Sequence, residues 1–197
     1  DVRQAMSAET RALVMSIAAS NGSLEDLMLA RETYVDAPLA EHYGFEQEGW
    51  VELDGVTQGG LLTQGTFLIG NSDGMNSHAI LRGVWLADVI LHDPPPDPPA
   101  NVPPLDESIP GFNKMTLNQK LFAHSDNEAC RRCHQKIDPW GIPFENFDAS
   151  GLWREKVLVV SKASDPPKDQ GGEQKKRKQP AFEKSYLEIE RESTLPD

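Results

Sequence analysis

Apolar side chains recur at helical spacing near the start of the chain. With a period of about 3.6 residues they form one stripe along a helix face: Met6, Leu13, Val14, Ile17 and Ala18. Asn21-Gly22 predicts the end of this helix, because both residues tolerate the left-handed backbone found at helix C-termini. We expect the apolar stripe to pack into a core.

The next signals along the chain are helix caps. Ser23 and Asp26 have the spacing of a capping box, and they predict a second helix that reaches about Arg31. Residues 36–44 begin with Asp-x-Pro and end with Gly, which predicts a short third helix. We therefore expect helices throughout residues 1–45.

The middle of the chain changes its pattern. Residues 50–53 alternate as in a strand and precede an Asp-Gly turn signal. Residues 59–70 are apolar and bounded by glycine, which suits a helix or a strand, and we favour a helix. Residues 80–91 predict a mostly buried helix because apolar side chains recur around all its sides.

Proline interrupts all regular structure in residues 93–105. The seven prolines there forbid a helix or a central strand: Pro94, Pro95, Pro96, Pro98, Pro99, Pro103 and Pro104. The segment should form extended polyproline II, most simply as a strap across the surface of its own domain. The alternative is a ligand for a groove-type partner domain.

Two further caps follow. Thr116 predicts the start of a helix over residues 117–124, and Ser125 with Glu128 predicts a capping box for the next helix. Residues 138–141 read Asp-Pro-Trp-Gly and predict a sharp end to that helix, because the residue before a proline avoids helical backbone. The expected fold class is mainly α with little β structure.

The helix between these signals carries Cys130-Arg131-Arg132-Cys133-His134, the pattern of a c-type haem attachment site. Two thiols add across the porphyrin vinyl groups, and the adjacent imidazole of His134 becomes the proximal iron ligand. A zinc half-site and a redox disulfide are the alternatives. Zinc needs more ligands, but the chain has only two cysteines, and the remaining histidines form no closely spaced pair: His42, His78, His92 and His124. We expect a cytochrome c-like helical domain with haem c, and hence iron, as its cofactor.

The far side of the iron decides between electron transfer and catalysis. No Met or His follows His134, so a sixth ligand of the usual type from this chain would lie upstream. The upstream candidates are Met75, His78, His92, Met115 and His124. Met75 lies in a loop-like stretch, and loops can deliver ligands to rigid sites. For each single candidate the alternative is an ordinary role at the surface, in the core or around the site. His124 is close to the motif in sequence, and it could serve as a ligand or form a hydrogen bond with a haem propionate.

Other residues near the motif suit the surroundings of a haem. The aromatic side chains that follow it would wall the cofactor: Trp140, Phe144, Phe147 and Trp153. Three arginines would pair with propionates: Arg131, Arg132 and Arg154. A backbone carbonyl near Asp138 or Pro139 would accept a hydrogen bond from Nδ1 of His134 and orient the ring. The alternative for these residues is an ordinary core or surface role.

Composition and cofactor together indicate the cellular location of the protein and its type of partner. Haem c is attached outside the cytoplasm, so we expect a periplasmic or otherwise exported protein. The chain begins at Asp1 without a signal peptide, which suggests a processed chain or an internal fragment. A net charge of −12 disfavours nucleic acid as a partner and suits a cationic redox protein. No apolar run is long enough to span a bilayer, and residues 161–197 predict a charged, flexible extension.

Several of these stretches together resemble the large exported cytochrome-like multidomain proteins of planctomycetes. The resemblance is carried by residues 59–65, 81–85, 94–104, 130–141 and 144–148. It implies that residues 1–45 are the helical tail of an upstream domain. Residues 46–160 would form the haem c domain with its proline strap, before the extension at 161–197. The family also tends to carry a histidine at the position of His124, whereas His78 and Met75 look particular to this chain.

We therefore expect a haem domain that transfers electrons within a larger redox protein. Its partners would be other domains or fragments of that protein, or a separate redox partner. The second hypothesis is an oxidoreductase of the peroxidase or oxidase type with an open distal face. The third is an interaction module in which the haem is structural and the strap and charged extension bind partners.

Overall fold

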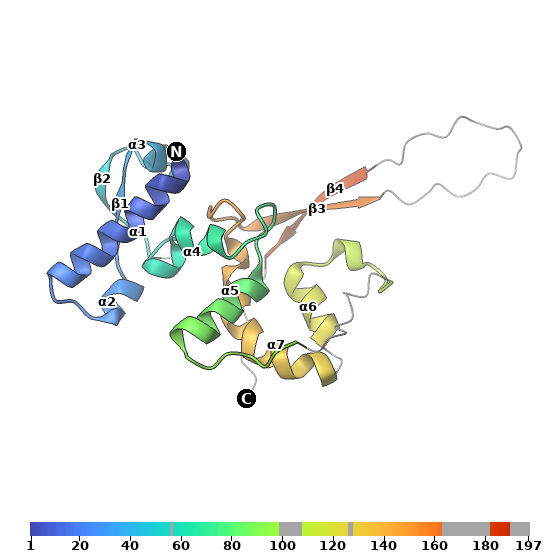
Figure 1. Ribbon diagram of the computed structural model, residues 1–197. Helices are drawn as coiled ribbons and strands as arrows, with labels where there is room; N and C mark the ends of the chain where they lie inside the picture. Colours follow the sequence, from blue (N-terminus) through green and yellow to red (C-terminus); the bar gives the residue numbers. More distant parts are fainter. Residues whose placement is uncertain (56, 99–107, 126–127, 163–181, 190–197) are drawn as a thin grey trace, which may run out of the picture.

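The computed structural model describes residues 1–55, 57–98, 108–125, 128–162 and 182–189 (Figure 1). The expected mainly α fold is confirmed, since the described sheets are two small antiparallel pairs of strands. Figure 1 shows the N-terminal elements at one side, α5, α6 and α7 at the other, and α4 between them. Among the described residues, no helix is long and apolar enough to cross a membrane.

Three helices and one strand pair build the N-terminal part. The helices are α1 (Val2–Ala19), α2 (Leu24–Met28) and α3 (Ala37–Tyr43), and the strands are β1 (Glu32–Val35) and β2 (Gly49–Glu52). The predicted caps are confirmed: Ser23 and Asp26 form a capping box, and α3 runs from an Asp36 cap to a left-handed Gly44. The second helix is shorter than expected. It ends at Met28, and residues 32–35, also expected to be helical, form β1, whose partner is the predicted strand near residue 50.

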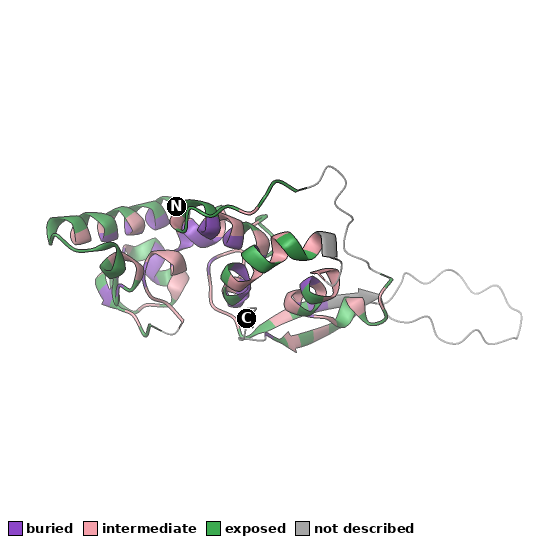
Figure 2. Ribbon diagram, turned by 90° about the horizontal axis from the view of Figure 1, so that it is seen from below, coloured by how far each residue is buried: buried purple, intermediate pink, exposed green. Residues whose placement is uncertain are grey.

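The buried face of α1 differs from the expected stripe. It consists of Ala5, Met6, Glu9 and Leu13, whereas Val14 is 41% exposed and Ala18 lies on the surface. Figure 2 shows exposed residues along one side of this N-terminal helix and buried residues along the other. The buried face is therefore rotated relative to the expected stripe, because it includes the carboxylate of Glu9, which the sequence pattern predicts at the surface.

Glu9 is buried because hydrogen bonds satisfy both of its carboxylate oxygens. The Thr33 hydroxyl donates to Oε1 at 2.8 Å, and the Tyr43 hydroxyl donates to Oε2 at 3.1 Å. Both donors are in turn held by α4 (Gly65–Gly70) and the residue before it: the Gln64 amide donates to Thr33, and the Gly65 N–H donates to Tyr43. Two hydrogen-bond chains thus run from the start of α4 to one carboxylate in α1.

Burial raises the pKa of Glu9 from 4.5 to about 7, although its two hydrogen bonds oppose this shift. The folded chain then binds a proton that the unfolded chain has lost between these pH values. The free energy of unfolding should therefore fall as pH rises from 4.5 to 7, by about 3 kcal/mol at most. Urea unfolding across this range measures the effect. Glu9→Gln should flatten the slope, whereas Glu41→Gln, at an exposed position of α3, should leave it as in the wild type.

Between residues 61 and 146, the regular elements of the described residues are all helices. Its elements are η1 (Leu61–Thr63), α4, α5 (Ala79–Trp85), the π-helix η2 (Leu86–Ile90), η3 (Phe112–Lys114), α6 (Leu117–Ser125), α7 (Glu128–Gly141) and η4 (Ile142–Asn146). This confirms the helix favoured for residues 59–70. The helix expected over residues 80–91 is also present, with a π-helical second half, but Leu81 and Val89 are exposed.

Aromatic side chains form the core of this part. Phe67, Leu68 and Phe147 are its buried members, and the partly buried Leu62, Trp85, Phe144 and Trp153 pack against them. The ring of Phe67 lies 5.0 Å from Trp85 and 5.3 Å from Phe144, in edge-to-face arrangements. The aromatic residues after the motif therefore hold α4, α5 and η4 together.

Helices α5 and α7 cross at two glycines. A Cβ on Gly83 would lie 2.5 Å from the carbonyl oxygen of Ile137, and one on Gly141 would overlap the carbonyl oxygen of Ala79. Ala79 therefore lies beside the end of α7, and Gly83 lies about one turn nearer to its start. The two helices run antiparallel at this contact.

The caps around α6 and α7 are partly as expected. Thr116 and Gln119 cap α6 reciprocally, because each backbone N–H donates to the other's side chain at 3.1 to 3.2 Å. The capping box of Ser125 with Glu128 involves a side chain outside the described part. The helix ends within the expected residues 138–141, but only at Gly141, because α7 continues through Pro139.

The last described residues form a strand pair. β3 (Lys156–Lys162) pairs antiparallel with β4 (Phe182–Glu188), although a flexible extension was expected from residue 161. Residues 163–181 and 190–197 lie outside the described part, as do residues 99–107 of the predicted proline strap. Residues 93–98 are described and have no regular secondary structure, in keeping with their prolines.

Candidate functional site

The cysteine and histidine pattern lies in the first turns of α7. Cys130, Cys133 and His134 are all half-buried. Cys130 and His134 continue the helix stripe that ends in the buried Ile137 and Gly141, two residues that pack on α5. The motif therefore projects from the same face of α7, beyond the region that α5 covers.

Both cysteines are free thiols in this structure. One helical turn separates them, so both can reach one flat ligand on the same side of α7. Among the described residues, no group of three or more His, Cys, Asp or Glu side chains has the arrangement of a metal site. The two thiols and the imidazole are the groups that covalent attachment of a porphyrin requires.

Asp138 orients the imidazole of His134. Nδ1 of His134 lies 2.9 Å from one carboxylate oxygen of Asp138 and 3.1 Å from the other. The two side chains are only 14% and 17% exposed. A proton on Nδ1 satisfies the carboxylate and leaves Nε2 with its lone pair, which is the form that binds iron.

The sequence interpretation named a backbone carbonyl for this hydrogen bond, and the acceptor is instead a side chain. The reason is the length of α7. Because the helix continues past Pro139, Asp138 lies one turn after His134 on the same face. The His-x-x-x-Asp spacing was a visible signal, but a helix end expected within residues 138–141 left the position of Asp138 relative to His134 open.

His124 lies beside His134. Their ring centroids are 5.4 Å apart with the planes at 70°, an edge-to-face contact between the end of α6 and the start of α7. Burial lowers the pKa of His124, and the nearby His134 lowers it further. The two rings touch directly, so His124 flanks His134.

Met75 lies at the other end of the helix pair. It is 86% exposed in a turn held by Asp73, whose carboxylate accepts hydrogen bonds from the N–H groups of Met75 and Asn76. This turn leads into α5 at Ala79, which lies beside the end of α7. The structure thus does not bring Met75 to Cys130.

The other upstream candidates have local roles or lie apart from the contact described above. Nδ1 of His78 accepts a hydrogen bond from the Leu81 N–H and so caps α5. His92 is exposed, with Nδ1 lying 3.3 Å from the Asp88 carbonyl oxygen. Met115 is half-buried between η3 and α6.

The residues expected around the haem are divided between two places. Arg131 and Trp140 are on α7 itself, where Arg131 is exposed and Trp140 is 41% exposed. Phe144 belongs to the aromatic core. Arg154 donates hydrogen bonds to the Glu145 carbonyl at 3.2 Å and the Ser77 hydroxyl at 2.7 Å. Its guanidinium is therefore engaged away from the motif helix.

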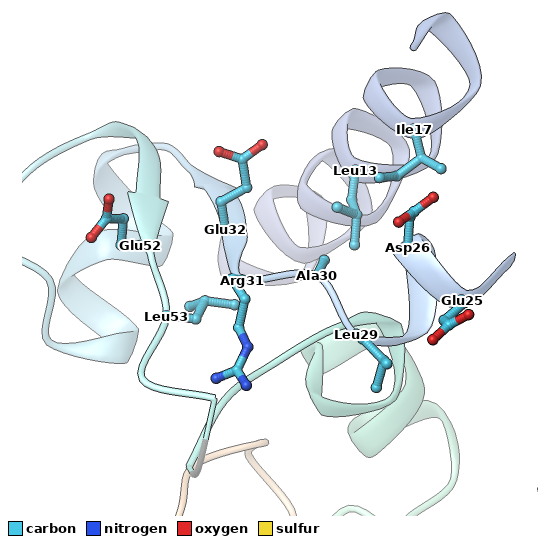
Figure 3. A pocket seen from close by; sticks show the side chains of 10 residues that line it. All are labelled: Leu13, Ile17, Glu25, Asp26, Leu29, Ala30, Arg31, Glu32, Glu52 and Leu53. Carbon is cyan, nitrogen blue, oxygen red and sulfur yellow. The ribbon is translucent and has the colours of Figure 1, made fainter. Parts of the chain in front are cut away.

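A separate hollow occurs in the N-terminal part (Figure 3). It is an open groove of about 740 Å³ between α1, α2 and the ends of β1 and β2. Its lining combines apolar side chains, including Leu13, Ile17 and Leu29, with carboxylates such as Glu25 and Glu32. None of the motif residues lines this groove.

Two family comparisons cover most of the described helices. Residues 1–45 match PSD4, a protein of unknown function (DUF1592), and residues 58–157 match PSCyt3, a protein of unknown function (DUF1588). By name, both are planctomycete-type cytochrome c-associated domains. No curated protein and no solved structure matches the chain. The second match spans more than half of the 197 residues and includes α7 with its motif. The chain therefore belongs to the PSCyt3 (DUF1588) family.

Proposed function

We propose that this chain is a c-type haem domain of a larger exported redox protein and that it transfers electrons through the bound haem. Cys130 and Cys133 would hold the cofactor by thioether bonds, and Nε2 of His134 would ligate its iron. The observation that carries the proposal is the arrangement on α7. Two free thiols and an imidazole with its Nδ1 already engaged share one helix face.

The setting of the domain supports the same proposal. The names of the two matched families indicate a cytochrome c-related domain family. Haem c attachment takes place outside the cytoplasm, so the precursor would be exported to the periplasm or beyond. The partners proposed are neighbouring domains of the same larger protein and a redox protein that exchanges one electron with the iron.

An absorption spectrum combined with intact mass tests the proposal. The full chain, expressed with export and a haem-attachment system, should gain the mass of one haem and show a Soret band that persists after denaturation. Replacing Cys130 and Cys133 by Ser removes both covalent links, so the denatured double variant should lose both signals. A wild-type chain with the mass of the bare polypeptide and no Soret band would overturn the proposal.

The spin state separates electron transfer from catalysis. A low-spin ferric spectrum that does not respond to cyanide or peroxide is expected of an electron carrier. The alternative is a peroxidase- or oxidase-like enzyme. It is favoured by one observation, the carboxylate on His134, because an electron-rich proximal ligand promotes cleavage of a bound O–O bond. A high-spin spectrum that shifts with peroxide would establish this second function.

A further inference from the structure

We propose that Asp138 lowers the reduction potential of the haem iron by holding the proton on Nδ1 of His134. Through this hydrogen bond the carboxylate makes the imidazole a stronger electron donor and favours ferric over ferrous iron. Asp138 is thus a positioning and tuning residue that does not contact the iron. The inference rests on the proposed haem attachment and goes beyond it, because attachment requires only Cys130, Cys133 and His134.

The geometry makes this pair a strong one. Both carboxylate oxygens of Asp138 lie within 3.1 Å of Nδ1, and the two residues are one turn apart on a single helix. Charge-assisted hydrogen bonds of this kind are about twice as strong as those to a neutral carbonyl. Both side chains are largely buried, so water screens the interaction weakly.

The nearest lysine in sequence does not neutralise the carboxylate of Asp138, because it pairs with another residue. Lys136 is two residues before Asp138 and points to another side of α7, where its ammonium pairs with Asp93 at 2.6 Å. His124 contacts the ring of His134 in an edge-to-face arrangement. The negative charge of Asp138 is therefore directed at the His134 imidazole.

A carboxylate behind a metal-bound histidine raises the basicity of that ligand. The stronger donor stabilises the higher oxidation state of the iron, and hydrogen bonding to the axial ligand is one of the means by which a protein sets haem potential. The predicted haem is accordingly easier to oxidise than one whose histidine donates to a backbone carbonyl. It would suit a partner of higher potential that accepts one electron.

The test compares Asp138→Asn with Asp93→Asn in the haem-loaded full chain. Asparagine keeps the shape of the side chain and removes the charge behind His134. At a fixed applied potential the ferrous-to-ferric ratio should rise at least about tenfold, which is 59 mV for one electron. Asp93→Asn removes the same charge from a 66% exposed side chain that pairs with Lys136, and should change the ratio less than about twofold.

Three outcomes distinguish this inference from the proposed function. Covalent haem in all three proteins with equal potentials would overturn the role of Asp138 and leave the haem proposal standing. A wild-type chain without haem would overturn both. If Asp138→Asn does not retain haem, ¹⁵N NMR of the haem-free wild-type chain shows which ring nitrogen of His134 carries the proton. Neutral His134 should carry its proton on Nδ1, and a proton on Nε2 would contradict the inference.

Discussion

Arg82→Met should strongly lower the free energy of unfolding, the largest effect we expect from any single substitution in this chain. The Arg82 side chain is fully buried, with 0% exposure. Its guanidinium donates to four backbone carbonyls, at 2.6 to 3.0 Å: those of Leu68, Phe144, Phe147 and Asp148. One side chain thus joins α5 to the end of α4 and to the segment that follows α7. Methionine has a similar length but no donor, so these carbonyls would lose their charged partner.

The expected cost is at least about 4 kcal/mol, because hydrogen bonds from a charged donor contribute about 1.5 to 3 kcal/mol each and do not add fully. This is a large part of the stability of an ordinary domain, about 5 to 15 kcal/mol. Burial lowers the pKa of Arg82 to about 10, with Arg154 as a further cause, so the guanidinium stays charged at neutral pH.

Urea unfolding followed by circular dichroism measures this cost. Arg82→Lys keeps the charge but offers one nitrogen in place of a planar fork, so it should recover only part of the stability. Arg11→Met, at an exposed position of α1, is the matched control and should stay within about 0.5 kcal/mol of the wild type. An Arg82→Met protein within about 1 kcal/mol of the wild type would show that the four hydrogen bonds are dispensable.

Gly141→Ala should produce the second largest effect, by forcing α7 away from α5. The added Cβ would overlap the carbonyl oxygen of Ala79 and lie 2.9 Å from its carbonyl carbon and 3.2 Å from Cα of Gly83. All three are backbone atoms, so no rotamer change can relieve the overlap. We expect a loss of about 2 to 3 kcal/mol, the usual range for overpacking in a core.

Gly70→Ala is the matched control for this substitution. Gly70 is the last residue of α4, and a Cβ there would meet no atom within 4 Å. The same added methyl should therefore be neutral or stabilising by up to about 1 kcal/mol, since alanine loses less conformational freedom than glycine on folding. Thermal unfolding of both variants gives the comparison. Equal stability of Gly141→Ala and Gly70→Ala would contradict the close crossing of the two helices.

Features that depend on a few neighbouring residues were predictable from the sequence. The Ser23 and Asp26 capping box, the Gly44 helix end and the Thr116 cap are all present, because each needs only groups within four residues of one another. The strand near residue 50 was recognised by its alternation. Its partner β1 was not, because pairing over a separation of about 17 residues leaves no local signal.

Features that depend on partners distant in sequence were missed or misplaced. Glu9 lies in the core because Thr33 and Tyr43 satisfy it, so Val14 turns outward. Phe144 and Phe147 have the sequence position of haem-lining residues, yet their rings pack with Phe67 and Trp85. The burial of Arg82 was not predictable, because an arginine inside an apolar helix is ordinarily a surface residue.

The sequence by itself determined the chemistry available to this protein. The order of residues along the backbone fixes the spacing of Cys130, Cys133 and His134. The expected cofactor and the helix that carries it therefore follow from the chain alone. Tertiary structure decided what surrounds that chemistry. Gly141 contacts α5, and α7 continues past Pro139, so Asp138 lies one turn after His134 on the same helix. Because α5 and α7 run antiparallel, Met75 lies at the end of α7 away from Cys130. Packing and electrostatics depend on distances between segments, and only the folded chain sets those distances.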